Sequence, residues 1–378
     1  MEKNQSIIVD DYERNVNLSI QWNRFLLKPL GTWPNLRESK VGKCYSVLIG
    51  IVCYGLISFM LTSSNMFLVV EVKDTYNRIK MIGPLSFFVM TLMKYYFLTF
   101  HEDNIRKGIE HIKWDWKNVK HQEDKKIMIE YANYGKKLAL ISTFFVYSAF
   151  VFYYFVVPIS VGKIRDENLT FIPLPFPSSK LIADVRQSPA NEILFSIQVL
   201  SGVIIHAITA AAVSIAAVFA VHACGQMQML MNWLECLVDG RSDMNKIVDK
   251  RIAKIVVQHD RILKWIFGTY RKSASTNIFC RIFRLYNEYV SSRILSNSGM
   301  ESERNITFVN LHIITHFVHL QHFYILLYRR IGCRTVSKSW RNDIYDRMVP
   351  INRQEKALLR FNHCNVQFID KIYSWKYG

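Results

Sequence analysis

The stretch ILFSIQVLSGVIIHAITAAAVSIAAVFAVHA (193–223) contains no lysine, arginine, aspartate or glutamate. Because about 20 helical residues cross the roughly 30 Å hydrocarbon core of a bilayer, it is long enough to form a transmembrane helix. Its run of small residues favours close packing against other helices. His206 is the one ionisable residue deep within it. Two readings of this imidazole remain open: a hydrogen bond to a neighbouring helix, or contact with a ligand or ion.

Three further apolar stretches precede this one, and together the four predict an all-α, polytopic membrane helix bundle. They cover residues 44–62, 81–100 and 138–160. Half of all residues are hydrophobic (50%), which also places the chain in the membrane class rather than among soluble domains. The chain is therefore expected to interact with the lipid bilayer.

The distribution of Lys and Arg predicts the orientation, because these residues resist translocation. The segments 1–43, 101–137 and 240–265 carry seven, nine and seven of them, whereas 63–80 and 161–192 carry three and four. Alternation then places the N-terminus in the cytoplasm and the segment 161–192 outside. That segment contains the sequon Asn168-Leu169-Thr170, so Asn168 is a predicted glycosylation site.

No pattern indicates an enzyme, a cofactor or a metal. The seven cysteines include no CxxC pair, and motifs for nucleophilic, phosphate-binding or zinc chemistry are absent from the sequence. The net charge of +18 raises the question of nucleic acid, since 17 Lys and Arg against 7 Asp and Glu give residues 268–378 a net charge of +10. Trp340-Arg341 and Trp375-Lys376 place a tryptophan beside a basic residue there. Two such pairs are weak support for stacking on bases, so we predict no nucleic-acid binding.

Four short strings resemble the insect odorant receptor family in their order and spacing. They are NRFLLKPLGTWPN (23–35), IRKGIEHIKWDW (105–116), HACGQMQML (222–230) and VVQHDRILKWI (256–266). Taken alone, the first suggests a turn at the bilayer surface, and the second and fourth suggest amphipathic helices. The fourth places Ile262, Trp265 and Ile266 on one face, opposite Asp260 and Lys264. The resemblance covers roughly residues 15–266.

The resemblance implies a seven-helix receptor with a cytoplasmic N-terminus in the plasma membrane of olfactory sensory neurons. Members of the family bind small volatile odorants and form odorant-gated cation channels with a shared co-receptor, as hetero-oligomers that we expect to be tetramers. Residues 1–43 would be the cytoplasmic N-terminal segment, and residues 44–266 would hold the first four spans and cytoplasmic anchor helices. His259, Ile262 and Trp265 would belong to the anchor helix where subunits meet.

The resemblance also implies where the odorant binds, among the outer halves of the second, third, fourth and sixth helices. The third apolar stretch supplies aromatic side chains near its outer end, and His206 lies in the fourth. The candidate ligand-binding residues are Phe150, Phe152, Tyr153, Tyr154, Phe155 and His206. The alternatives to an odorant receptor are a gustatory receptor and a non-channel membrane transporter or scaffold.

Residues 267–378 do not continue the family pattern, and we interpret them as translated one base out of frame. A one-base shift forces Trp340 before Arg341 to become Gly, and Met348 before Val349 to become Trp. Permitted codons elsewhere turn 306–327 into a nearly uninterrupted apolar span. His312, His316 and His319 then need no metal-binding or proton-relay role. The chain as written is expected to be non-functional, because the pore-lining seventh helix is lost.

Overall fold

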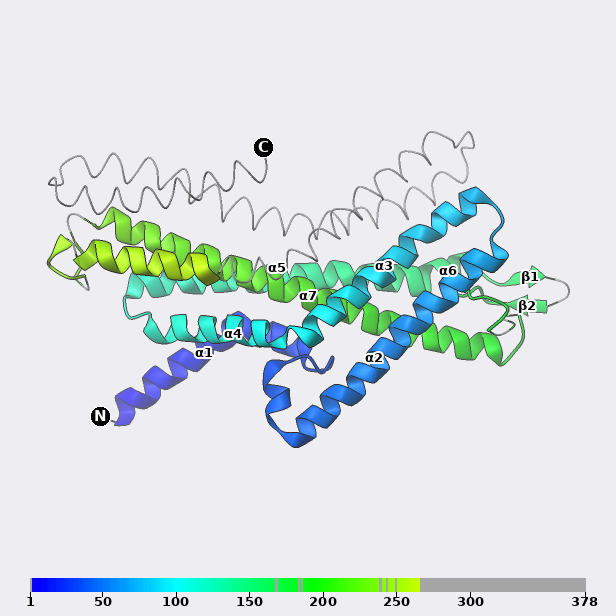
Figure 1. The fold of residues 1–378 in the computed structure, drawn as a ribbon, viewed down its shortest axis with the longest axis horizontal. Helices are drawn as coiled ribbons and strands as arrows, with labels where there is room; N and C mark the ends of the chain where they lie inside the picture. The colour runs from blue at the N-terminus through cyan, green and yellow to red at the C-terminus, as the bar shows by residue number, and fades with distance from the viewer. Residues whose placement is uncertain are drawn as a thin grey trace. The chain divides into compact units, whose positions relative to one another are not determined.

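The computed structural model describes residues 2–166, 169–182, 184, 186–237, 240–242, 244–248 and 250–265, and this part of the chain is almost entirely helical (Figure 1). The helices are α1 (Glu2–Leu27), α2 (Lys40–Met66), α3 (Thr75–Phe100), α4 (Glu102–Asn118), α5 (Gln122–Val151), α6 (Val157–Val161) and α7 (Ala190–Glu235). Shorter helical turns are η1 (Pro34–Glu38), η2 (Phe67–Glu71) and η3 (Phe152–Val156), and residues 250–265 are also helical. Two three-residue strands, β1 (Ile164–Asp166) and β2 (Leu169–Phe171), pair as an antiparallel hairpin.

The described residues fall into two compact units. The first comprises residues up to 225 together with 264 and 265, and the second comprises residues 226–263. Within the first unit, α2 packs on α3, and α1 packs on α4 and α5.

The four predicted spans all form helices, although their membrane character is uneven. Three continuous helical stretches are long and apolar enough to cross a bilayer: Lys40–Glu71, Gln122–Val161 and Ala190–Glu235. The predicted span 81–100 lies within α3, but Lys94 and a helix-interior Pro84 dilute its apolar character. By length and composition the described residues therefore give three clear spans, where the sequence predicted four.

The helix that contains residues 193–223 is also the most buried of the three. In its most apolar part 67% of residues are buried, against 22% in each of the other two. Small side chains make this possible, because Ala210, Ala211 and Ala217 are almost fully buried and let neighbouring helices approach closely. At about 1.5 Å per residue, the 46 residues of α7 extend about 69 Å, more than twice the hydrocarbon thickness.

The N-terminal helix α1 presents a buried polar stripe at four-residue spacing, formed by Asn15, Ser19 and Asn23. Such spacing places the three side chains on one helix face. The Ser214 hydroxyl of α7 donates to Asn23 Oδ1 at 2.6 Å, and Trp116 Nε1 of α4 donates to Ser19 Oγ at 3.0 Å. The stripe is therefore matched by donors from two other helices.

The turn that follows α1 is buried against other parts of the chain, and its place relative to the bilayer surface stays a prediction. Trp33 is only 6% exposed. Gly31 adopts a positive φ of 68°, a conformation that favours glycine. The Ser46 hydroxyl donates to Gly31 O at 2.5 Å, and Tyr95 Oη donates to Leu30 O at 3.1 Å. Side chains from α2 and α3 thus satisfy the carbonyl groups that the turn exposes.

The helix formed by α5 and α6 contains a π turn with an identifiable cause. Pro158 has no N–H group to bond the carbonyl of Tyr154, so the regular α-helical pattern fails there. The chain passes this point through η3, in which the Val157 N–H bonds the carbonyl of Phe152. The π turn changes the direction in which the side chains of residues 152–156 project.

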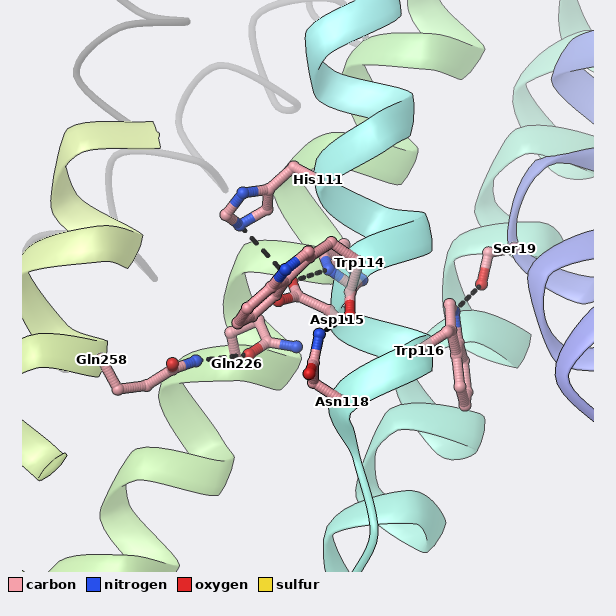
Figure 2. Close-up of polar contacts among 9 residues, drawn as sticks. Ser19, His111, Trp114, Asp115, Trp116, Asn118, Gln226 and Gln258 are labelled. Carbon is pink, nitrogen blue, oxygen red and sulfur yellow. Dashed lines mark hydrogen bonds and ion pairs between the residues drawn. The ribbon is translucent and has the colours of Figure 1, made fainter.

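In the second unit, the end of α7 faces the helical residues 250–263. Gln258 Nε2 donates to Gln226 Oε1 at 3.0 Å (Figure 2), and Lys254 Nζ lies 4.6 Å from the centre of the Trp233 ring. Ile262 is fully buried, whereas Asp260 is exposed, which agrees with the predicted faces of this helix. Burial lowers the pKa of His259.

Several sequence-based expectations lie outside the described residues. They are the glycosylation site Asn168, the side chain of Ile266, the histidines of 306–328 and the frame change from about residue 267.

Candidate functional site

An aromatic cluster surrounds His206 in the first unit. We define it as Phe87 and Phe88 of α3, Phe150 of α5, Tyr154 of η3, Phe176 of the loop before α7, and His206 of α7. The ring centres of Phe87, Phe150 and Tyr154 lie 5.5, 5.3 and 6.0 Å from that of His206. Such spacings are those of interacting aromatic pairs. Side chains from α3, from α5 with η3, and from the loop before α7 thus meet around the imidazole of His206.

The loop before α7 is fixed into this cluster by a side-chain amide. Gln198 Nε2 donates to Phe176 O at 2.8 Å, and its Oε1 accepts from Phe176 N at 3.1 Å. Both polar groups of the Phe176 backbone are therefore satisfied in a buried position. The centre of the Phe176 ring then lies 5.1 Å from that of Phe88 and 5.5 Å from that of Tyr154.

Gly202 provides the space for the Tyr154 ring. A Cβ atom at residue 202 would lie 2.4 Å from Tyr154 Cζ and 2.8 Å from its Oη. The carbonyl of the same glycine bonds His206 Nδ1 at 2.7 Å. Gly202 therefore positions both a tyrosine hydroxyl and an imidazole.

A second cluster consists of polar side chains around Asp115 of α4 (Figure 2). It includes a residue further along α7. His222 Nε2 donates to Asp115 Oδ2 at 2.8 Å, and His111 Nε2 lies 3.4 Å from the same oxygen. The His111 ring stacks on Trp265, with ring centres 4.6 Å apart. The Asp115 side chain is 1% exposed. A carboxylate so deeply buried requires polar partners, and His222 and His111 both approach the same carboxylate oxygen.

The chain's sequence matches the profile of the seven-transmembrane odorant receptors over residues 77–329, about two thirds of its length. The chain belongs to the odorant receptor family. The matched region extends beyond residue 267, where we had expected the family pattern to stop. No curated protein sequence matches the chain.

Solved structures of a receptor from the same family share the fold. The structure of the insect olfactory receptor OR5 from Machilis hrabei matches with a TM-score of 0.72 at 13% identity, covering 94% of this chain and 90% of that chain. The structure of OR5 in complex with eugenol matches with a TM-score of 0.62 at 14% identity, covering 84% and 80%. At this identity the likeness establishes the fold.

Membership of the family settles three sequence-based expectations. The receptor is a multi-pass membrane protein of the all-α class, and the predicted fold class is confirmed. It is a receptor and not an enzyme. The gustatory-receptor and transporter alternatives are set aside by the odorant receptor match.

The structure places the six predicted ligand-binding residues of the odorant receptor unequally. Phe150, Tyr154 and His206 share the aromatic cluster, and Tyr153 stacks 6.3 Å from Phe176. Phe155 touches Phe150 edge-on but is 36% exposed. Phe152 contacts only the ring of Tyr153 among the described aromatic side chains.

Sequence reasoning missed residues in both clusters. Phe87, Phe88 and Phe176 were not predicted, although Phe87 and Phe88 are the adjacent aromatics at the centre of the second apolar stretch. Asp115 carried a usable signal. It lies on the apolar face of α4 with Ile112 and Trp116, and a carboxylate on such a face implies a buried partner.

Three of the four family strings meet around Asp115. Asp115 and Trp116 come from the second string, His222 begins the third, and Trp265 ends the described part of the fourth. Of the predicted anchor residues, His259 and Ile262 belong to the second unit and Trp265 to the first. Within the described residues, no group of three or more side chains is arranged to hold a metal ion.

Proposed function

We propose that this receptor is the ligand-binding, tuning subunit of an odorant-gated, non-selective cation channel that it forms with a shared co-receptor. The observation that carries the ligand-binding part is the aromatic cluster around His206, built from α3, α5, η3, α7 and the loop before α7. Binding sites for small molecules are lined mainly by apolar and aromatic side chains with a few placed polar groups. The related OR5 was solved with eugenol, a small volatile, and we propose a ligand of similar size here.

We propose that the odorant contacts Phe150, Tyr154 and His206. Tyr153, Phe152 and Phe155 would lie at the edge of the aromatic cluster. Substituting an edge aromatic such as Phe155 by Ala should weaken the response to an activating odorant less than substituting Phe150. The measurement is the odorant concentration that gives half-maximal current. Equal effects at the two positions would place the ligand elsewhere.

The receptor is proposed to lie in the plasma membrane of olfactory sensory neurons, with its N-terminus in the cytoplasm. The excess of Lys and Arg in segments 1–43, 101–137 and 240–265 supports this orientation. A tag at Met1 should be accessible to antibody only after permeabilisation, and Asn168 should accept a glycan. A tag detected on intact cells contradicts the proposal.

The anchor residues His259, Ile262 and Trp265 are proposed to stabilise subunit contacts. The burial of Ile262 supports this, because Ile255 and Ile262 lie seven residues apart and form a buried apolar face on this helix. Ile262→Asp should reduce recovery of the co-receptor with the tagged chain, while Val257→Asp, at an exposed position, should not.

Residues from about 267 onward are proposed to be out of frame, and the channel function of the chain depends on this point. The forced codons described above support the proposal, whereas the family match through residue 329 in the present frame supports the opposite. The nucleotide sequence distinguishes them. A stop codon in the alternative frame within 267–378 rules the frame change out.

The functional test compares the chain as written with a frame-restored version, each co-expressed with the co-receptor. Residues 329–378 have no long apolar run, and charges such as Arg341, Asp343 and Asp346 would each cost about 2.5–3.5 kcal/mol at the centre of a bilayer. We therefore expect no odorant-evoked current from the chain as written. A robust current from it, absent with the co-receptor alone, contradicts the frame proposal and supports the channel proposal.

A further inference from the structure

Two fully buried tyrosines in the first unit differ in one respect. Tyr95 and Tyr154 are both 0% exposed. Tyr95 Oη donates to Leu30 O at 3.1 Å, whereas the Tyr154 hydroxyl has no hydrogen-bond partner. Most buried polar groups are paired, because leaving one unpaired is unfavourable. An unpaired hydroxyl in an otherwise apolar cluster therefore calls for a ligand or for another physical cause.

The position of Tyr154 is built by two local features. It lies in the π turn η3 that Pro158 causes, and π turns recur at functional sites. Its ring lies against Gly202, where a Cβ atom would approach Tyr154 Cζ to 2.4 Å. The π turn η3 and the missing side chain at Gly202 of α7 together fix the position of the Tyr154 hydroxyl.

A hydrogen-bond acceptor belongs to the same aromatic cluster as this donor. His206 Nδ1 is 2.7 Å from Gly202 O, and because a carbonyl oxygen only accepts, Nδ1 carries the hydrogen. The ring is 7% exposed and surrounded by Phe87, Phe150 and Tyr154, so the neutral form is favoured. Its Nε2 is then an acceptor. The Tyr154 and His206 ring centres are 6.0 Å apart.

We propose that Tyr154 and His206 select odorants that carry an alcohol or phenol hydroxyl on an aromatic skeleton. The Tyr154 hydroxyl donates to the odorant oxygen, and the odorant hydroxyl donates to His206 Nε2. The rings of Phe87, Phe88, Phe150 and Phe176 receive the apolar skeleton. This inference rests on the proposed function, which places the odorant in the aromatic cluster, and adds the chemical class that the cluster recognises.

The proposal predicts a ranking among odorants of one size. A hydroxyl satisfies both Tyr154 and His206, a carbonyl satisfies only Tyr154, and a hydrocarbon satisfies neither. The probes are 2-phenylethanol, phenylacetaldehyde and propylbenzene, which share a phenyl ring and the same chain length. Each hydrogen bond should contribute about 3- to 10-fold in affinity.

Binding is measured on the purified full chain in lipid nanodiscs, by the dissociation constant and by the rise in unfolding temperature. Tyr154→Phe should weaken 2-phenylethanol and phenylacetaldehyde by about 3- to 10-fold and leave propylbenzene unchanged. His206→Leu should weaken 2-phenylethanol alone. Tyr95→Phe is the matched control and should alter all three probes equally or not at all.

The outcomes separate this inference from the proposed function. Binding of all three probes with no selective effect of Tyr154→Phe overturns the inference and leaves the proposed site intact. Failure of all three to bind overturns both. The ligand-free protein gives an independent readout, since Tyr154→Phe should leave the unfolding temperature unchanged or raise it, whereas Tyr95→Phe should lower it. An equal loss in both variants shows that the Tyr154 hydroxyl is structural, and overturns the inference.

Discussion

His206 and His222 are carried by the same helix, 16 residues apart, and their surroundings are opposite in kind. His222 donates to a buried carboxylate, Asp115, from another helix. His206 bonds only the carbonyl one turn before it, within a cage of aromatic rings. At His222 a hydrogen bond joins two helices, whereas at His206 hydrogen-bonding capacity remains available. The comparison distinguishes a histidine that bonds another helix from one that we propose contacts a ligand.

The same substitution at both histidines tests most directly whether they differ in their contribution to stability. His222→Leu leaves the Asp115 carboxylate buried without its closest donor, and should lower the free energy of unfolding by about 3 kcal/mol. His206→Leu orphans no other group, because the Gly202 carbonyl keeps its helical partner, and should cost less than about 1 kcal/mol. Denaturant unfolding in lipid nanodiscs measures both.

The double variant Asp115→Leu/His222→Leu is the control for this prediction. Replacing a buried polar pair by apolar residues is often neutral, so stability should recover most of the loss seen in His222→Leu. A double variant as unstable as the single one would show that the loss comes from altered packing.

Glycine substitutions test whether both regions depend on close helix packing. A Cβ at Gly108 of α4 would lie 2.4 Å from Phe219 Cζ of α7, near the Asp115 cluster. Because the Phe219 ring is buried, Gly108→Ala should cost about 1–3 kcal/mol. Gly202→Ala should cost a similar amount by displacing Tyr154. Gly55→Ala is the control: no atom lies within 4 Å of its Cβ, and thermal unfolding should show no loss.

A smaller effect is expected from the neighbour of Asp115. Trp116→Phe keeps most of the ring and removes the hydrogen bond from Nε1 to Ser19 Oγ, so it should cost about 1 kcal/mol. Trp114, two residues earlier and 50% exposed, provides the control. If Trp114→Phe lowers the unfolding midpoint as much, the contact with α1 is not what stabilises this region.

The smallest effect concerns a third histidine, His259, whose pKa is lowered by burial from its ordinary value of 6.5. The unfolded chain therefore binds a proton at a higher pH than the folded chain does. The free energy of unfolding should then fall as pH drops below about 6.5. His259→Gln should remove this part of the pH dependence between pH 7 and pH 5. An unchanged pH profile would show that other groups dominate.

The sequence predicted the helices well, because long apolar runs and flanking charges report directly on membrane spans. It placed the second span less securely, since Lys94 and Pro84 weaken that pattern. Of the site, it predicted Phe150, Tyr154 and His206 through their position in the third and fourth stretches. It could not predict Phe176, because a residue in a loop is positioned by its tertiary partner Gln198. It did not predict the burial of Trp33, because the turn that carries Trp33 is held by contacts with α2 and α3.

The bond between Asn23 and Ser214 joins residues separated by 191 positions. At about 5–20 residues per second, the ribosome needs about 10–40 s to synthesise the intervening chain. During that interval the polar stripe of α1 lacks its partner on α7, although α1 is the first helix to be made. The N-terminal helix must therefore wait for the completion of the fourth apolar stretch. A nascent chain arrested before residue 214 should therefore leave α1 more sensitive to protease than it is in a chain that includes α7.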